Sequence, residues 1–152
     1  MRIVLLACSK RKQQTKGTLP ARDFYTGLLF KESLSYAENR LNPAPDRIYI
    51  LSALHHLVEL NQPLCYYNLC LRDLKAAAQK AWAEVVKDQL IQEGCKLQND
   101  EFIFLTGRDY YIHLLPYLNN YMLPMANAGC RGYGDMLHWL QNHNGQIPYQ
   151  IP

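Results

Sequence analysis

Long apolar runs are missing from this sequence. No hydrophobic stretch approaches the ~20 residues that a membrane-spanning helix needs, and the N-terminal stretch lacks the long apolar region of a signal peptide. We therefore expect a cytoplasmic location. The chain has 152 residues, 49% of them hydrophobic and 19% charged, without an internal repeat or a biased tract. This size and composition predict a single α/β domain over residues 1–152.

Sequence motifs for metals and cofactors are also missing. The five cysteines are irregularly spaced and include no CxxC pair, which fits reduced thiols better than a disulfide framework or a structural zinc site. HExxH, the Walker motif GxxxxGK[ST] and GxGxxG do not occur, and His113, His138 and His143 are scattered. We therefore expect no metal and no organic cofactor, and nucleoside triphosphate or dinucleotide binding has little support.

Acidic residues are missing from the first 22 positions, which carry six basic residues. This segment is therefore +6, whereas the rest of the chain, with ten basic and thirteen acidic residues, is −3. The net charge of +3 thus hides a local concentration of positive charge, as expected for a protein that binds phosphate at one place. A solvated basic loop without a function is the alternative interpretation.

Short buried runs alternate with helical spacing along the chain. The runs of β-forming residues predict strands at residues 3–7, 48–51, 102–105 and 121–125. Apolar residues at helical spacing predict helices at residues 24–37, 73–94, 111–118 and 135–142, with Asp73 as the N-cap of the second. Residues 62–71 are irregular, and residues 147–152 form a tail, ordered or frayed. The alternation predicts an α/β fold, a three-layer sandwich with a mostly parallel four-stranded sheet.

A polar turn follows each predicted strand. The four turns are residues 9–12, 52–56, 106–109 and 127–132. Because the carboxyl ends of parallel strands lie at one edge of a sheet, and ligands bind there in open α/β folds, these turns should face one cleft. This cleft is the predicted functional site.

The first turn combines the hydroxyl of Ser9 with three adjacent cations. Backbone amides and Ser9 supply local hydrogen bonds, while Lys10, Arg11 and Lys12 add long-range attraction, so the turn suits a phosphodiester. Two further cations are candidates for substrate binding, Arg22 in the same basic segment and Arg108 in the third turn.

The second turn contains Ser52, His55 and His56. Their side chains supply hydrogen bonds, or a general acid or base that works near neutral pH. The alternative is that Ser52 caps the following segment and that one histidine only packs.

Eleven tyrosines are many for a chain of this length. Aromatic stacking commonly holds unpaired or flipped bases, so a base-binding pocket would use some of them. Tyr25 and Tyr67 are the candidates, because both lie beside polar turn residues and outside the helical stripes. The alternative is ordinary half-buried packing with a solvated hydroxyl.

Hydrolysis of an N-glycosidic bond needs a carboxylate or an amide that positions water, and groups that stabilise the developing charge. The carboxylates and amides beside predicted turns are Asp23, Asp109, Asp135, Asn68 and Asn127. Asp23 and Asp135 suit helix capping equally well. Cys8 has nucleophilic chemistry in principle, but no feature pairs it with a base, and a small buried thiol is the preferred interpretation.

Several segments resemble a widespread bacterial and phage domain family. The matching segments are 7–12, 21–26, 49–58, 67–69, 107–110 and 132–140. CSKRK at 8–12 and SALHHLV at 52–58 are the most specific of them. That family resembles the uracil-DNA glycosylase fold, domains of 7-deazaguanine-modification enzymes, and small antiphage DNA glycosylases that remove a modified, glucosylated cytosine from phage DNA.

The resemblance implies chemistry at the glycosidic bond of a nucleotide, with modified phage DNA as the expected partner. The residues that carry over are Cys8, Ser9, Lys10, Tyr25, Ser52 and His55. Two positions depart from the family pattern, which often has glycine in place of His56 and an acidic residue in place of Asn68. The water-activating motif GQDPY of uracil-DNA glycosylases is absent, so residue roles cannot be transferred from them.

The leading hypothesis is a DNA glycosylase that hydrolyses the N-glycosidic bond of a modified base in phage defence. The expected catalytic residues are His55, Asn68 and Asp23. The expected substrate-binding residues are Cys8, Ser9, Lys10, Arg11, Lys12, Arg22, Tyr25, Ser52, Tyr67 and Arg108. Two alternatives stay open: a non-catalytic nucleic-acid or nucleotide-binding module, and a base-exchange enzyme of 7-deazaguanine modification.

Overall fold

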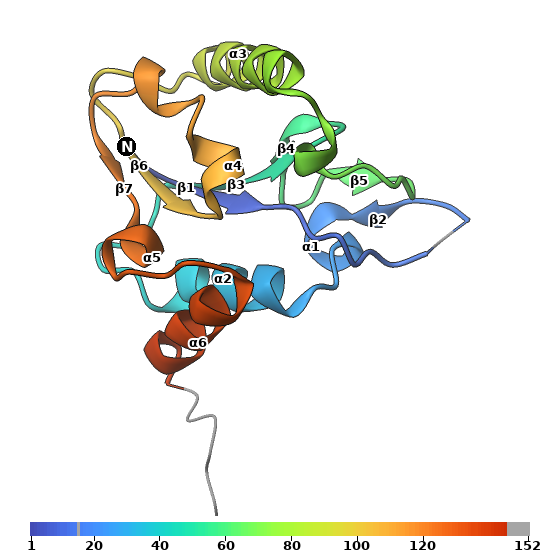
Figure 1. Cartoon of the computed structure of the whole chain (residues 1–152), viewed down its shortest axis with the longest axis horizontal. Helices are drawn as coiled ribbons and strands as arrows, with labels where there is room; N and C mark the ends of the chain where they lie inside the picture. Colours follow the sequence, from blue (N-terminus) through green and yellow to red (C-terminus); the bar gives the residue numbers. More distant parts are fainter. Residues whose placement is uncertain (15, 146–152) are drawn as a thin grey trace, which may run out of the picture.

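A five-stranded mixed sheet, mostly parallel, organises the chain in the computed structural model, which describes residues 1–14 and 16–145. The strand order is β4-β3-β1-β6-β7 (Figure 1). The strands are β1 (Arg2–Ala7), β3 (Arg47–Ser52), β4 (His56–Glu59), β6 (Glu101–Leu105) and β7 (Tyr121–Met122). Only β4 runs antiparallel to its neighbour. The predicted α/β class and mostly parallel sheet are therefore confirmed, whereas the predicted count of four strands is one too low.

The central strand β1 is buried on both faces. Ile3, Val4, Leu5 and Leu6 have no exposed surface, as expected for a strand inside a parallel sheet. Ile3 and Leu5 point into one hydrophobic core, and Val4 and Leu6 into the other. The alternation of side chains along the strand thus gives the protein two cores, one on each side of the sheet.

Helices cover both faces of the sheet, so the molecule has three layers (Figure 1). One face is covered by α3 (Ala76–Gln92), whose Trp82, Val86 and Leu90 are buried in the first core. The other face is covered by α2 (Leu28–Asn39) and α6 (Tyr133–His143), which contact each other. Within the described part of the chain, no helix is long and apolar enough to cross a membrane.

Several elements differ from the prediction. The predicted helix 24–37 is observed as α2 (Leu28–Asn39), because Tyr25 pairs with Lys12 in a β-bridge instead of starting the helix. Strand β4 falls within the predicted second turn and the residues after it, where the apolar run is too short to indicate a strand. Helix α3 begins at Ala76 instead of Asp73, because Asp73 ends a 3-10 turn (η1, Leu71–Asp73) and accepts the N–H of Cys70. The predicted helix 111–118 is divided into α4 (Arg108–Tyr111) and η2 (Leu115–Tyr117).

The predicted fourth strand, 121–125, is also shorter than expected. Only Tyr121–Met122 pairs with β6, and Pro124 then begins α5 (Pro124–Asn127). Proline has no N–H for a sheet ladder but fits the first turn of a helix. The predicted tail at 147–152 lies outside the described residues.

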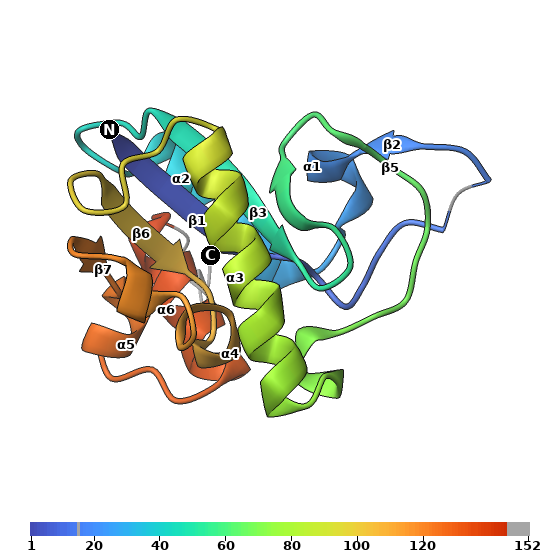
Figure 2. The same ribbon diagram turned by 90° about the horizontal axis from the view of Figure 1, so that it is seen from above.

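A small arm extends from the body of the protein. It contains a two-stranded sheet in which β2 (Leu19–Pro20) pairs antiparallel with β5 (Pro63–Leu64), followed by α1 (Ala21–Phe24). Figure 2 shows this arm on the side of the sheet opposite to β7. The buried side chain of Leu64 packs into one of the two cores. Backbone hydrogen bonds from Ala21 N–H to Gln62 O (2.9 Å) and from Arg22 N–H to Leu60 O (2.8 Å) join the two chain segments that form the arm.

Candidate functional site

The carboxyl ends of β1, β3 and β6 meet at one edge of the sheet. Immediately after β1, the N–H of Cys8 donates to Leu51 O at the end of β3 (3.0 Å). The thiol of Cys8 lies 3.2 Å from the hydroxyl of Tyr110, in α4 after β6. The first three predicted turns therefore lie together, as expected. The fourth, 127–132, is mostly exposed, and its Cys130 packs on the core beneath α2 and α6.

Three hydroxyl groups lie in contact at this edge, and we call Tyr25, Ser52 and Tyr67 the hydroxyl cluster. The hydroxyl of Tyr67 lies 2.8 Å from that of Ser52 and 2.6 Å from that of Tyr25. Ser52 Oγ also accepts the N–H of His55 (3.0 Å). The indole N–H of Trp82 donates to the carbonyl of Ser52 (2.8 Å) from the other side of the strand. Ser52 is thus fixed through both its side chain and its backbone.

The ionisable groups around the hydroxyl cluster are held in their neutral forms. Burial raises the pKa of Tyr25 to about 12, although hydrogen bonds from Ser52 and Tyr67 oppose the effect. Burial also raises the pKa values of Tyr67, Tyr110 and Cys8. Since a thiol reacts as its thiolate, the raised pKa of Cys8 gives no support to a nucleophilic role. The site offers hydrogen bonds rather than charge.

The two histidines of the second turn lie on different sides of Ser52. The half-buried ring of His55 meets the ring of Tyr67 edge to face, with 5.1 Å between centroids. The ring of His56 stacks on Trp82 at 6.4 Å. Burial lowers the pKa of both, and His55 lowers that of His56 further, so both are neutral near pH 7. His55 therefore faces the hydroxyl cluster, while His56 packs on α3.

The backbone at His56 has the shape that glycine favours. Its φ angle is +65°, in the left-handed region that side chains with a Cβ rarely adopt. Glycine would adopt this conformation without steric cost. This turn therefore has a backbone that suits glycine better than histidine.

The basic turn after β1 is held from inside by Ser9. Its hydroxyl accepts the N–H of Gly27 (2.8 Å) and donates to the carbonyl of Arg11 (2.6 Å). The N–H of Thr26 donates to the same carbonyl (2.9 Å). Ser9 is buried, so its observed role is to shape the loop. This leaves Lys10 and Arg11 exposed at the surface.

Lys12 connects the basic turn to the hydroxyl cluster. Its ammonium group lies 4.7 Å from the ring centroid of Tyr67, a cation–π distance. A backbone bridge between Lys12 and Tyr25 ties the two segments together. A cation therefore stands directly beside neutral hydrogen-bonding groups.

The other predicted residues lie in different surroundings. Arg22 forms an ion pair with Glu38 of α2, with N–O distances of 3.0 and 3.2 Å, and Arg108 is exposed at the start of α4. Asp23 and Asn68 are exposed, and neither is hydrogen bonded to the hydroxyl cluster in the described structure. Placement of water by either residue stays a prediction. Asp135 lies in the first turn of α6, whose N-cap is Gly132, and it accepts the N–H of Arg131 (3.0 Å), so it does not cap the helix as the alternative interpretation expected.

The structure corrects the stacking role expected of Tyr25. Its side chain has no exposed surface, so its ring has no free face for a base. Tyr67 is half-buried and packs against Phe24, with 5.8 Å between stacked ring centroids, and against Lys12. Both tyrosines serve the site through their hydroxyl groups.

Sequence reasoning did not select three residues that shape the site. Trp82 was expected in a helical stripe and as a match to the resembling family, but not as a residue of the site, although a buried indole N–H needs an acceptor and so offers a signal. Tyr110 lies in a segment that resembles the family described above. Its contact with Cys8 connects the turns after two different strands, so the sequence alone does not indicate it. The sequence does not indicate a role for Gly27, because its role depends on the close approach of the Ser9 hydroxyl in the folded structure.

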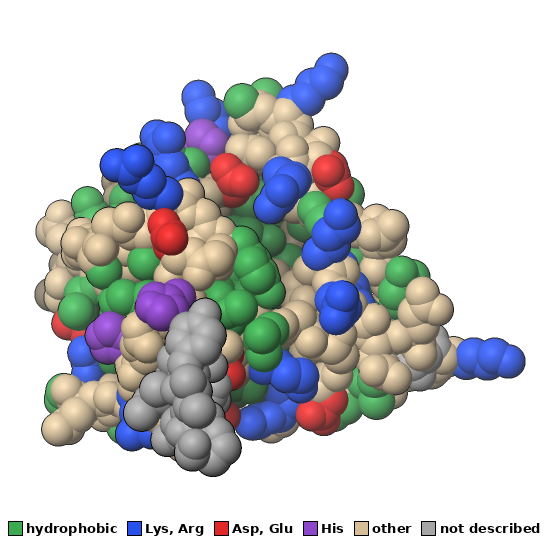
Figure 3. Space-filling model, turned by 60° about the horizontal axis from the view of Figure 1, so that its bottom comes forward, with side chains coloured by type: hydrophobic (Ala, Val, Ile, Leu, Met, Phe, Trp, Pro, Cys, Tyr) green, Lys and Arg blue, Asp and Glu red, His purple; other side chains and the backbone are tan. Residues whose placement is uncertain are grey.

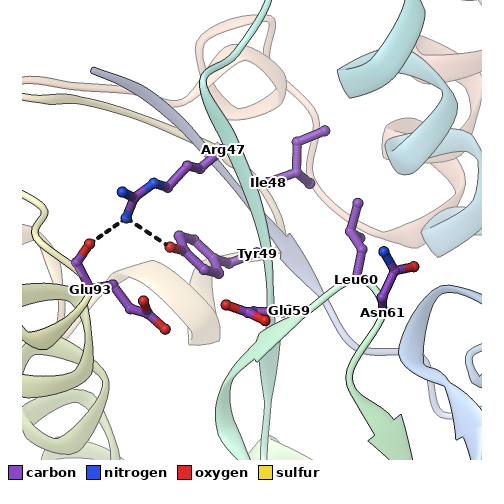
Figure 4. A pocket seen from close by; sticks show the side chains of 7 residues that line it. All are labelled: Arg47, Ile48, Tyr49, Glu59, Leu60, Asn61 and Glu93. Atoms are coloured by element: carbon purple, nitrogen blue, oxygen red, sulfur yellow. Dashed lines mark hydrogen bonds between the residues drawn. The ribbon is translucent and has the colours of Figure 1, made fainter.

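A separate open cavity of about 430 Å³ lies at the other end of β3 (Figure 4). Its arginine, Arg47, donates to the hydroxyl of Tyr49 (3.2 Å) and to the carbonyl of Glu93, so its charge is already engaged. Glu59 and Leu60 line the same cavity. It is remote from the basic turn, because Arg47 begins the strand that Ser52 ends. Among the described residues, no three His, Cys, Asp or Glu side chains gather as a metal site.

The sequence matches one family model over residues 3–142, and the chain therefore belongs to that family, a family of unknown function (DUF6884). No curated protein matches the sequence. The family match includes every residue of the site described above.

Proposed function

We propose that this member of the family binds DNA and hydrolyses the N-glycosidic bond of a modified base. One observation carries the proposal: Lys12 stands 4.7 Å from the ring of Tyr67, whose hydroxyl contacts Ser52 and Tyr25. A nucleotide has an anionic phosphate next to a neutral sugar and base. A cationic turn next to neutral hydroxyls matches that distribution of charge.

The two halves of the site would bind different parts of the nucleotide. Lys10, Arg11 and Lys12 attract and hold the phosphates, with Arg108 at the third turn as a further contact. Tyr67, which is half-buried, supplies a hydrogen bond to the sugar or to the edge of the base, and the fully buried Ser52 holds the hydroxyl of Tyr67 in place.

The hydrolytic step rests on the expected resemblance of the domain family with CSKRK and SALHHLV segments to antiphage DNA glycosylases. In this step a water oxygen bonds to C1′ of the sugar, the bond from C1′ to the base nitrogen breaks, and the base leaves with the electron pair and gains a proton. His55 faces the hydroxyl cluster and would donate a hydrogen bond to the departing base. Asn68 or Asp23 would place the water.

The architecture also supports the proposal, at a coarse level. A mostly parallel sheet between helical layers agrees with the resemblance to the uracil-DNA glycosylase fold. Because one fold supports many activities, this agreement concerns the arrangement of elements and not the reaction.

Formation of abasic sites tests the activity directly. The protein is incubated with phage DNA that carries modified cytosines, and abasic sites are converted to strand breaks with mild alkali. The wild type should cut modified DNA, and Ser52→Ala and His55→Gln should cut it at least about tenfold more slowly, as for loss of one transition-state hydrogen bond. His138→Gln, at an exposed ring on α6, is the matched control. Tight binding without breaks in any modified DNA would sink the glycosylase proposal.

A second candidate function is a non-catalytic nucleic-acid-binding module. It is favoured by one observation, that no carboxylate of the described residues hydrogen bonds to the hydroxyl cluster. This candidate predicts that Lys12→Ala weakens DNA binding while His55→Gln changes nothing measurable. Incorporation of a free base into DNA, instead of its simple loss, would indicate the base-exchange alternative.

A further inference from the structure

We propose that the arm beside the cleft is a second contact surface for the nucleic acid, and that Tyr66 stacks on an unpaired base of the bound strand. We call residues 10–14, 16–20 and 61–70 the basic arm. The inference rests on the DNA-binding part of the proposed function, and it does not depend on the hydrolytic step.

The basic arm carries positive charge only. Its first segments contain Lys10, Arg11, Lys12 and Lys16, and neither they nor residues 61–70 contain an acidic residue. Lys10, Arg11 and Lys16 are exposed. Figure 3 shows several lysine and arginine side chains, with a few acidic ones among them, between the body of the protein and the arm. The cations of the basic arm attract a phosphate backbone over about a Debye length, ~8 Å at physiological salt.

Tyr66 is the aromatic side chain that the basic arm presents to solvent. It is 44% exposed, whereas its neighbour Tyr67 is turned inward to Ser52 and Tyr25. An exposed tyrosine in a cationic surface is the combination that single-stranded nucleic-acid sites use, because the cations hold the backbone while the ring holds a base. Tyr66 thus supplies the free ring face that Tyr25 lacks.

The basic arm is continuous with the hydroxyl cluster. Lys12 belongs to the arm and lies over Tyr67, and Tyr67 follows Tyr66 in the chain. A strand with one nucleotide at Tyr67 would therefore lay its next nucleotides along the arm. Bases in a duplex are stacked on both faces, so the partner of Tyr66 is an unpaired base beside the extruded one.

Binding of unmodified DNA tests this inference apart from catalysis. Fluorescence anisotropy with a labelled single-stranded oligonucleotide and with a duplex of equal length gives Kd for each. Tyr66→Ala should raise the single-strand Kd about tenfold, the effect of one lost stacking contact, while Tyr66→Phe stays near wild type. Tyr121→Ala is the matched control, since Tyr121 is 42% exposed on β7, at the opposite side of the sheet.

The salt dependence supplies a second readout. Lys16→Ala should reduce the slope of log K against log salt concentration by about 0.7 for a single strand, the share of one phosphate contact. Equal single-strand affinities for Tyr66→Ala, Tyr121→Ala and the wild type would overturn the stacking role. If Tyr66→Ala binds the single strand more weakly and the wild type forms no abasic sites, the contact role of the basic arm is supported and the glycosylase proposal is rejected. If the wild type binds no DNA, both proposals are rejected.

Discussion

Gly27 and Ser9 approach each other so closely that no side chain fits between them. The N–H of Gly27 donates to Ser9 Oγ at 2.8 Å, and a Cβ atom on Gly27 would lie 2.2 Å from that oxygen. Since Ser9 Oγ also bonds the carbonyl of Arg11, the glycine fixes the basic turn against the start of α2. The shape of the basic turn therefore depends on a residue that lies outside it.

Gly27→Ala should destabilise the protein and weaken DNA binding together. The new methyl group must displace the Ser9 hydroxyl, which breaks its two hydrogen bonds and moves the loop, and overpacking of this kind costs about 1–3 kcal/mol. Urea unfolding followed by tryptophan fluorescence measures the loss. The backbone of Gly27 is extended, with φ −63°, so alanine adds no backbone strain there.

Two variants control this prediction. Gly134→Ala in α6 places its methyl group in open space and should raise stability by up to about 1 kcal/mol, the helix preference of alanine. Ser9→Ala in the Gly27→Ala background should recover part of the lost stability. Without the Ser9 hydroxyl, the atom nearest to the new methyl group at position 27 would be the Cβ of residue 9, at 3.2 Å. No loss in Gly27→Ala alone would show that the contact does not hold the loop.

Tyr67→Phe should cost about 1–3 kcal/mol of unfolding free energy. The change removes the hydroxyl that contacts both Ser52 and Tyr25, and both groups stay buried with one partner fewer. Tyr66→Phe, one residue earlier and exposed, is the control and should stay within about 0.5 kcal/mol of the wild type. Equal stabilities of the two variants would mean that the hydroxyl cluster is not a stabilising network.

The sequence was sufficient to predict the framework of the site but not its interior. The strands around Leu5, Ile50 and Phe104 follow from short buried runs, and the meeting of the turns after them follows from parallel pairing. Strand β4 could not be predicted, since its partner β3 supplies the pairing and its own apolar run is short. The shape of the turn before β4 depends on a single left-handed residue, His56.

The roles within the site were harder to predict, because they depend on which atoms a side chain meets. The sequence indicated that Tyr25 and Tyr67 belong near polar turns, but burial decides that Tyr25 offers a hydroxyl and no ring face. Ser9 stood among the expected substrate-binding groups, yet its two hydrogen bonds are inside the protein. Such contacts join segments that are distant in the sequence, so no local pattern contains them.

His56→Gly should be more stable than His56→Ala by about 1 kcal/mol, the cost of a left-handed backbone at a residue with a Cβ. Both variants lose the ring that stacks on Trp82, so the pair isolates the backbone at φ +65°. The measurement is the difference between the two unfolding free energies under one set of conditions. If the alanine variant equals the glycine variant, this turn is not held in the left-handed conformation.

Stability should fall as the pH is lowered through the range in which ordinary histidines titrate. Burial lowers the pKa of His55 and His56, so near and below about pH 6.5 the unfolded chain binds more protons than the folded one. Their contribution is complete above that pH and is lost as the pH falls toward the folded pKa values. The unfolding free energy of the His55→Gln/His56→Gln double variant should therefore depend less steeply on pH between about 7 and 5 than that of the wild type. Parallel curves of unfolding free energy against pH for the two proteins would show that the histidines bind protons as readily in the folded state as in the unfolded chain. That result would contradict the half-buried packing of His55 on Tyr67 and of His56 on Trp82.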